Sequence, residues 1–485
     1  MKAARLLAVA PLQAAQALVG FGSIVVFTRL MSAEDFGRYA LALSISMAAH
    51  TLLFTWAEAA AFRFFATAQA ARRLADHFAT LLGIAFLLGG ATLLVTAFIL
   101  SRAGLAHEAS SIAAFAAGAA SLRFVTRIAR ETDRASLSFT RYAVLETAYL
   151  ALGFAAGVGL LIYFDLGAAA PFAGLMLAGV LIAMIDAPRL FAQASGGYVT
   201  LMRTQLYAQY GTPLALALVV DLGVQALART LVATQAGEAS LGAYAAAFGL
   251  TRPLDLIFTG VAATFAPMLF SAYEKEGAGA ARGVAADAFA WLCALTLPAC
   301  VGLAMVAEPL TTLMIGRALS AEAAAAMPWL AFAALCSGFA LHYWSEAFQL
   351  THRTGQRALL MLAPGAVQLM LTFALARTYG AQGAAIASAA GAALAACLLA
   401  LRGRKLFDMP APSGVLVRIA IATASMAGVL AMLPAGDGAG WFALRVGVGL
   451  VTYLAVASAL NVLGARDRIV RAILRPAPAT AGAEG

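Results

Sequence analysis

Four arginines at helical spacing are the residues of this sequence with the clearest chemistry. Arg123, Arg127, Arg130 and Arg134 recur every three or four positions, so on a helix they form one basic stripe. Guanidinium groups bind phosphate through paired N–H donors, so the stripe predicts a site for a phosphate or diphosphate group. The alternative is attraction to anionic lipid. We favour binding for Arg123 and Arg127, and lipid anchoring for Arg130 and Arg134.

Other charged residues lie within or at the ends of apolar runs, where an ionisable group is costly unless it faces protein or water. Arg63, Arg229 and Arg252 are further candidate ligands for an anion. Internal ion pairs are the alternative for Arg229 and Arg252, because Asp221 and Asp255 lie nearby on the same apolar stretches. The candidates for coupling to H⁺ or Na⁺ are five carboxylates: Glu58, Glu146, Asp221, Asp255 and Glu346.

One of these carboxylates lies in an aromatic setting. His342 precedes Glu346 by four positions, beside Tyr343 and Trp344, so a proton relay and an interfacial aromatic belt both fit; we favour the belt. No catalytic residue, metal site or cofactor is predicted, although H⁺ or Na⁺ coupling stays open. The four cysteines lie in apolar runs without the spacing of a metal or redox pair: Cys293, Cys300, Cys336 and Cys397.

Membrane spans are the elements that must position these residues. The chain has 485 residues, 63% hydrophobic and 11% charged, and its mean hydropathy is +0.88. A soluble chain needs roughly a quarter of its residues charged, so we predict an all-α polytopic membrane protein. About fourteen spans of roughly 20 residues are expected. They cover 6–28, 39–59, 78–100, 110–129, 142–164, 171–187, 212–234, 243–271, 285–306, 327–350, 357–378, 382–401, 414–434 and 441–464.

The basic residues predict the orientation of these spans. The net charge is +9, but the charges are clustered in short segments between spans, which indicates the membrane surface rather than nucleic acid as the partner. Most Lys and Arg fall on one side if both termini are cytoplasmic. The clusters on that side include Arg72 and Arg73, Arg402 and Arg404, and Arg466 and Arg468.

A short internal repeat divides the chain. The pattern Gly37-x-Tyr39-Ala40-x-Ala42 returns as Gly242-x-Tyr244-Ala245-x-Ala247 at the corresponding place after the seventh span. Such placement predicts two parallel six-span lobes. We therefore expect an N-terminal lobe over 1–205, a C-terminal lobe over 206–405, two additional spans within 406–470, and a disordered cytoplasmic tail over 471–485.

The segment Thr28-Arg29-Leu30-Met31-Ser32-Ala33-Glu34-Asp35-Phe36-Gly37-Arg38-Tyr39-Ala40-Leu41-Ala42 resembles the first loop of Wzx-type polysaccharide-export flippases. These form a branch of the multidrug/oligosaccharidyl-lipid/polysaccharide (MOP) superfamily. The stretch Tyr379-Gly380-Ala381-Gln382-Gly383 also fits the family, as does Pro267 near the end of the eighth span. Two departures are Ser32-Ala33, where the family often has Gly-Pro, and Ala228, where an Asp commonly precedes the position of Arg229.

The resemblance implies two six-helix lobes facing each other across a central cavity, in the bacterial cytoplasmic (inner) membrane. It implies alternating access that carries an undecaprenyl-pyrophosphate-linked oligosaccharide from the inner to the outer leaflet, for O-antigen, capsule or exopolysaccharide synthesis. The expected partners are this polyprenyl-pyrophosphate-linked glycan, membrane lipids and a polysaccharide polymerase complex. In related flippases an extra helix pair shapes a groove for the polyprenyl tail, which is the role expected for spans thirteen and fourteen.

Three alternatives to this function differ from it in span number, loop length or motif. A MATE-like cation or drug antiporter of the same superfamily usually has twelve spans and a carboxylate-rich cavity, whereas embedded arginines favour an anionic substrate. A membrane enzyme that uses lipid-linked donors generally needs a long outer loop with acidic motifs, and no segment between the expected spans is that long. A peptidoglycan-precursor flippase is the third, although the quoted motifs look more like the export branch.

Overall fold

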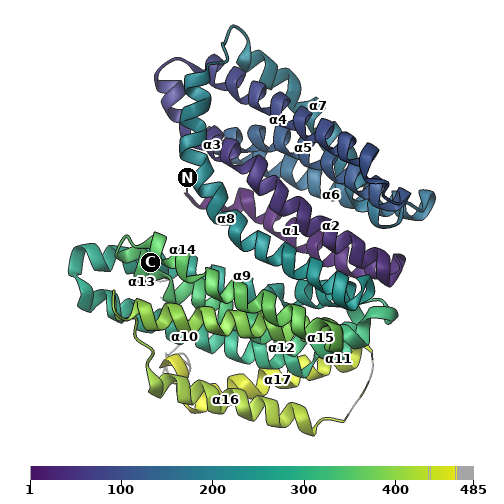
Figure 1. Ribbon diagram of the computed structural model, residues 1–485. Helices are drawn as coiled ribbons and strands as arrows, with labels where there is room; N and C mark the ends of the chain where they lie inside the picture. Colours follow the sequence, from purple (N-terminus) through teal and green to yellow (C-terminus); the bar gives the residue numbers. More distant parts are fainter. Residues whose placement is uncertain (1, 435, 437, 465, 467–485) are drawn as a thin grey trace, which may run out of the picture. The chain divides into compact units, whose positions relative to one another are not determined.

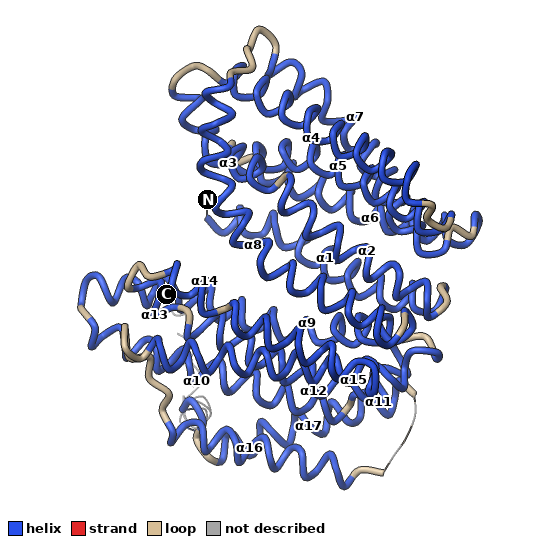
Figure 2. The backbone as a smooth tube through the Cα atoms, viewed as in Figure 1, coloured by secondary structure: helices blue, strands red, loops and turns tan. Residues whose placement is uncertain are grey.

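The protein is described by a computed structural model that covers residues 2–434, 436, 438–464 and 466. Within these residues the chain consists of helices joined by short connections, and no strand is present (Figure 2). This confirms the predicted all-α fold class. The tail predicted to be disordered, 471–485, lies outside the described residues.

The first half of the chain forms eight long α-helices and one short 3₁₀ turn (Figure 1). In chain order they are α1 (Lys2–Leu30), α2 (Ala33–Leu53), α3 (Thr55–Ala70), α4 (Leu74–Ala103), α5 (His107–Ala135), α6 (Phe139–Phe164), η1 (Gly167–Ala169), α7 (Ala170–Ala194) and α8 (Leu201–Ala236).

The second half alternates long helices with short helical segments. In chain order these are α9 (Glu238–Glu276), α10 (Ala278–Met305), α11 (Ala307–Met314), α12 (Arg317–Phe339), the π-helical turn η2 (Ala340–Trp344), α13 (Glu346–Leu350), α14 (Thr354–Leu360), α15 (Leu362–Gly403), α16 (Ser413–Met432), α17 (Ala439–Ala459) and η3 (Val462–Gly464).

The lengths and hydropathies of these helices agree with the predicted number of spans. Among the described residues, 12 helical segments are long and apolar enough to cross a membrane, and the bent pair α2–α3 makes up to 13. One segment, Thr354–Gly403, has 50 residues and is interrupted by Gly380, where φ is 53° and ψ is −133°. A side chain at such a positive φ would be strained, so glycine suits this break. Dividing the segment there gives two spans of roughly 20 residues, and hence about fourteen in all.

Two compact units are distinguished by their internal packing. The first comprises the described residues up to Gly249 together with Ile315–Leu319 and Thr372–Ala381. The second comprises Leu250–Met314, Ser320–Leu371 and the described residues from Gln382 onward. The predicted lobe boundaries at 205 and 405 stay predictions.

Close helix approaches build the first unit. Helix α7 packs against α6 and α5, while α8 packs against α2 and α3. A Cβ atom added to Gly174 of α7 would lie 2.3 Å from the backbone nitrogen of Gly157 on α6. The two backbones therefore touch directly, in the manner typical of small residues at membrane helix interfaces.

The two copies of the internal repeat also meet within the first unit. A Cβ atom on Gly37 would lie 1.8 Å from the carbonyl oxygen of Glu238, and one on Gly242 would lie 2.8 Å from the carbonyl oxygen of Ala33. An ion pair strengthens this contact, because Nε of Arg38 lies 2.6 Å from Glu238 Oε2. The repeated glycines thus allow the starts of α2 and α9 to pack side by side.

The second unit has one large apolar core. Helix α10 packs against α16, and α16 packs against α17. Phe258, Leu292 and Phe348 are among the buried side chains of this core. The predicted thirteenth and fourteenth spans correspond to α16 and α17, which therefore pack on the second unit.

Candidate functional site

A bend between α2 and α3 forms one wall of the candidate site. The two helix axes differ in direction by 47°. Phe54 joins them: its backbone N–H donates to the His50 carbonyl at 2.9 Å, and its ring stacks on Phe124 of α5 with centroids 4.6 Å apart. Packing of Phe54 against α5 thus brings the end of α2 and the start of α3 to one place.

Beside this bend lies a cavity of about 380 Å³ within the first unit. The first turn of α3 supplies Thr55 and Glu58, and the amino end of a helix carries a positive partial charge that favours anions. The full lining is Leu43, Ser46, Met47, His50, Thr51, Thr55, Glu58, Ala116, Ala119, Ala120, Arg123, Arg127, Tyr149, Phe172 and Leu175.

Arg123 lies in this wall with its guanidinium in a bidentate pair. Nη1 donates to Glu146 Oε2 at 3.1 Å, and Nη2 donates to Glu146 Oε1. The guanidinium carbon lies 4.3 Å from the centre of the Tyr149 ring, a cation–π arrangement. The side chain of Glu146 is only 4% exposed, so Arg123 neutralises a carboxylate that water hardly reaches.

Arg127 lies one turn further along α5 and shares a second carboxylate. Its Nε is 3.6 Å from Glu58 Oε2, and its Nη2 is 2.9 Å from Glu131 Oε1. Glu58 also contacts His50, with Nε2 and Oε1 2.9 Å apart. The cavity therefore presents two guanidiniums and an imidazole to a ligand, and each guanidinium is already paired with a carboxylate.

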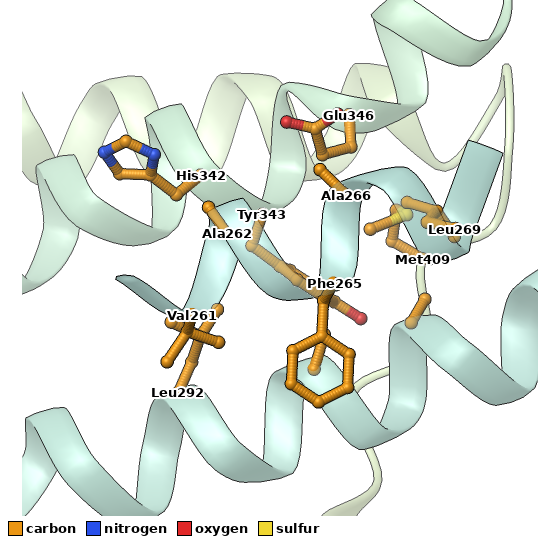
Figure 3. Close-up of a pocket in the computed structure, with 12 residues that line it drawn as sticks. Val261, Ala262, Phe265, Ala266, Leu269, Leu292, His342, Tyr343, Glu346 and Met409 are labelled. Carbon is orange, nitrogen blue, oxygen red and sulfur yellow. The ribbon is translucent and has the colours of Figure 1, made fainter. Parts of the chain in front are cut away.

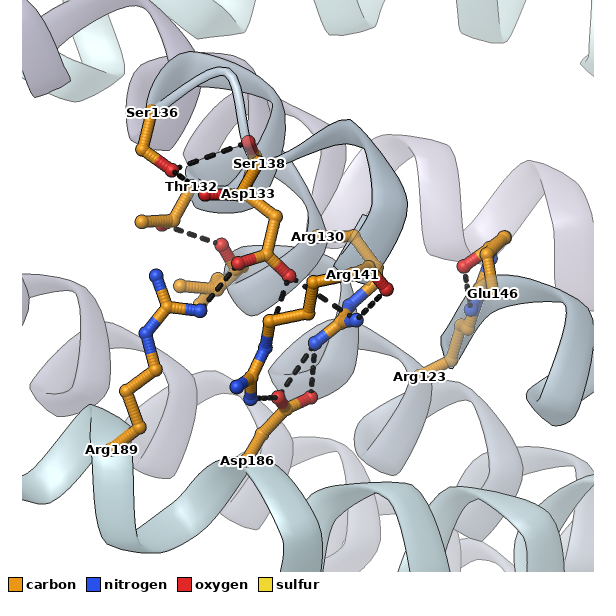
Figure 4. A network of polar contacts seen from close by, with 11 residues as sticks. Arg123, Arg130, Thr132, Asp133, Ser136, Ser138, Arg141, Glu146, Asp186 and Arg189 are labelled. Atoms are coloured by element: carbon orange, nitrogen blue, oxygen red, sulfur yellow. Dashed lines mark hydrogen bonds and ion pairs between the residues drawn. The ribbon is translucent and has the colours of Figure 1, made fainter. Parts of the chain in front are cut away.

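The remaining arginines of the stripe, Arg130 and Arg134, pair with other carboxylates. Arg130 is 1% exposed and pairs with both oxygens of Asp186 on α7, at 2.6 Å each. Arg141 reaches Asp186 as well, at 2.7 Å, and Arg189 binds Asp133 (Figure 4). The interpretation of Arg130 as a lipid anchor was therefore wrong, because its side chain is buried among α5, α6 and α7. Arg134 is 41% exposed and pairs with Glu131 at 2.8 Å.

Five other predicted site residues lie outside the lining of this cavity. Arg63 is exposed on α3, with its guanidinium 5.8 Å from the Phe64 ring centre. Asp221 accepts from Gln225 at 3.1 Å, and Arg229 lies 5.4 Å from the ring centre of Phe248. The last two are exposed on α9: Arg252 and Asp255.

Glu346 lies at a separate small cavity in the second unit. Its volume is about 20 Å³, enough for one water molecule. Figure 3 shows His342 and Glu346 above a floor of apolar side chains that includes Val261 and Phe265. Glu346 is 8% exposed, and its Oε2 has no hydrogen-bond partner among the described residues. The π-helical turn η2 ends just before it, and such turns often occur at functional sites.

The polar groups that line the larger cavity can bind an anion. They are two guanidiniums, one carboxylate, an imidazole, a phenol and several hydroxyls. Among the described residues, no three or more His, Cys, Asp and Glu side chains are grouped so as to hold a metal ion.

A family model described as "Polysaccharide biosynthesis protein" matches residues 26–322, more than half of the chain. The chain belongs to this family. No curated protein matches the sequence of this polysaccharide biosynthesis protein.

Several solved structures share the fold of this chain. The lipid II flippase MurJ in an inward closed conformation is 16% identical, with a TM-score of 0.76 over 95% of this chain and 99% of MurJ. A multidrug resistance MATE family transporter of the MOP superfamily, inward-facing, is 16% identical, with a TM-score of 0.69 over 80% of this chain and 94% of the transporter. An outward-facing MATE structure has a TM-score of 0.55 at 17% identity, over 83% and 94% of the two chains. The predicted polysaccharide biosynthesis family and the multi-pass membrane architecture are confirmed, and the solved structures show that the predicted fold is shared with MurJ and MATE transporters.

Sequence reasoning missed several residues that pair with Arg127, Glu58 or Arg130. Glu131 could have been found, because it lies four positions after Arg127 on the same helix. His50 could not, because its approach to Glu58 depends on the bend at Phe54. Asp133 and Asp186 were missed because their partners come from three helices.

Proposed function

We propose that this polysaccharide biosynthesis protein carries an undecaprenyl-pyrophosphate-linked oligosaccharide from the inner to the outer leaflet of the bacterial cytoplasmic membrane, by alternating access. The glycan would serve O-antigen, capsule or exopolysaccharide synthesis. The observation that carries the proposal is the pair Arg123 and Arg127, one helical turn apart in a cavity of about 380 Å³. Family membership agrees with a role in polysaccharide synthesis.

The two arginines suit a diphosphate for geometric and electrostatic reasons. Each guanidinium presents paired donors that match phosphate oxygens. On arrival, the diphosphate takes over donors of Arg123 from Glu146 and of Arg127 from Glu58. The amino end of α3 adds backbone N–H groups and a favourable dipole. Outside the cavity, Arg63, Arg229 and Arg252 are proposed as secondary contacts for the anionic headgroup, because charged side chains in membrane helices commonly mark substrate paths.

Both termini are proposed to lie in the cytoplasm, so that the basic segments face the anionic inner leaflet. A polysaccharide polymerase complex is the proposed protein partner, because it would consume the translocated lipid-linked glycan.

We propose that carboxylates couple transport to H⁺ or Na⁺. The candidates are Glu58, Glu146, Asp221, Asp255 and Glu346. Of these, Glu346 combines burial, an unpartnered oxygen and an adjacent water-sized cavity. A buried carboxyl in such a setting exchanges one small cation at a time, which is what coupling requires.

Replacing Glu346 by glutamine preserves its shape but removes the exchangeable charge. We expect substrate binding to survive, while transport driven by an imposed H⁺ or Na⁺ gradient falls by about tenfold, the equivalent of about 1.4 kcal/mol of coupling. The measurement is flipping of a fluorescent lipid-linked glycan in proteoliposomes with and without each gradient. Glu276→Gln is the matched control, because Glu276 is exposed at the end of α9. Unchanged gradient dependence in Glu346→Gln would remove this residue from the coupling mechanism.

Deletion of the gene tests the function itself. A completed lipid-linked repeat unit that accumulates on the cytoplasmic leaflet, and returns to normal when the gene is restored, is the expected result. Two other outcomes would replace the proposal. Accumulation of the peptidoglycan precursor with cell lysis would indicate a lipid II flippase, a candidate favoured by the likeness to MurJ. Unchanged lipid intermediates with sensitivity to cationic dyes would indicate an antiporter, favoured by the MATE likeness.

A further inference from the structure

The two arginines that line the larger cavity are paired with carboxylates in its wall or directly behind it. Arg123 is paired with Glu146, and Arg127 is paired with Glu58. Glu131 is shared between Arg127 and Arg134. The three guanidinium charges of Arg123, Arg127 and Arg134 are therefore matched by the three carboxylates Glu146, Glu58 and Glu131.

A diphosphate diester bears a negative charge on each phosphate group, so its entry would leave the cavity strongly negative. Buried carboxylates would then face an anion without compensation, which is unfavourable in a medium of low polarity. Glu58 and Glu146 cannot leave the site, because each is fixed on its own helix. The compensating charge has to come from outside, and a proton is the smallest available carrier.

His50 is the group placed to accept that proton. It lines the cavity, its side chain is 20% exposed, and its Nε2 lies 2.9 Å from Glu58 Oε1. Histidine is the side chain that ordinarily changes charge between about pH 5 and about pH 8. Because an ionised carboxylate can only accept a hydrogen bond, Nε2 carries the hydrogen in this contact, which leaves Nδ1 to bind an incoming proton.

We infer that His50 takes up one proton from water when a diphosphate ligand binds, and becomes the third cation of the site. This rests on the proposed function. The resulting imidazolium forms an ion pair with Glu58. This ion pair weakens the longer contact of 3.6 Å between Glu58 and Arg127. Arg127 is then released to bind the ligand, and the proton leaves again when the ligand departs.

The other charged and titratable groups of the cavity do not substitute for His50. They are Glu58 on α3, Arg123 and Arg127 on α5, and the phenol of Tyr149 on α6. Helix α8 also packs against α2, but its Arg203 is directed to Asp76 of α4, at 3.3 Å.

Isothermal titration calorimetry of the full chain in detergent micelles tests this inference. The probe is farnesyl-pyrophosphoryl-N-acetylglucosamine, titrated in pairs of buffers that differ in ionisation heat. We expect uptake of about one proton per ligand bound near neutral pH. Affinity should accordingly rise by up to about tenfold for each unit of pH lowered between about pH 8 and about pH 6.

The variant His50→Gln keeps a hydrogen-bond donor to Glu58 but cannot be charged. It should lose the proton uptake and bind at all pH values with the affinity that the natural protein shows at about pH 8. His352→Gln is the matched control, because His352 is exposed and lies outside the cavity; it should behave like the natural protein.

Three results would overturn the inference. The first is binding with the same heat in both buffers and an affinity that does not depend on pH. The second is proton uptake that His50→Gln retains. Either result would contradict proton uptake by His50 but would leave the proposed function standing. Absence of any binding by the natural protein would overturn the proposed function together with this inference.

Discussion

Arg123→Gln is expected to lower transport of the lipid-linked glycan by at least about 30-fold, the equivalent of about 2 kcal/mol. Glutamine fills much of the same space but offers the diphosphate no charge and no paired guanidinium donors. The measurement is flipping in proteoliposomes, supported by complementation of the gene deletion. Arg102→Gln serves as the control, because Arg102 is exposed at the end of α4.

Loss of activity in Arg123→Gln has a second cause that must be separated from the first. The variant leaves Glu146 buried without its partner, which destabilises the fold. The double variant Arg123→Gln/Glu146→Gln restores neutrality, since two amides can hydrogen-bond to one another. We expect it to regain most of the thermal stability but not the transport. Recovery of transport in the double variant would mean that Arg123 only neutralises Glu146.

Asp186→Asn is expected to lower the free energy of unfolding by about 3 to 5 kcal/mol, the usual effect of breaking a buried ion pair. Asp186 neutralises Arg130, which is 1% exposed, and also binds Arg141 (Figure 4). With an amide at position 186, Arg130 keeps its charge and retains Asp133, at 3.2 Å, as its nearest carboxylate. The fold of α5, α6 and α7 should weaken as a unit.

Thermal unfolding of the purified protein in detergent measures this effect. Glu276→Gln, an exposed carboxylate changed in the same way, should leave the midpoint unaltered. A midpoint for Asp186→Asn equal to that of the natural protein would show that the cluster adds nothing to stability. Transport by whatever folded protein remains should be near normal, because the cluster lies outside the cavity lining.

The helical architecture could be predicted from the sequence, since apolar length alone indicates a membrane span. The gap expected between 378 and 382 coincides with the break at Gly380, because glycine in a polar interruption allows the chain to change direction. Helix ends were less predictable. Helix α8 begins at Leu201 rather than near 212, because its first turns carry polar side chains that still favour helix.

The partners of the arginines could be predicted only in part. Spacing on one helix indicated the stripe that contains Arg123 and Arg127, but spacing does not say which neighbouring helix each arginine faces. In the structure, Arg123 and Arg127 line a cavity, whereas Arg130 lies in a buried ion-pair cluster because α7 places Asp186 beside it. His50 lies beside Glu58 in the cavity wall only because the chain turns by 47° between α2 and α3.

Under the proposed function, the size of the cavity at this bend limits how much of a glycan can contact it. A volume of about 380 Å³ lies near the lower end of the range for small-molecule sites, roughly 300 to 1,000 Å³. A diphosphate and the sugar attached to it would occupy such a space, and later sugars would extend beyond it. Selection at this cavity would then rest on the first sugar of the repeat unit. Longer and shorter glycans that begin with the same sugar would then be accepted equally at this cavity.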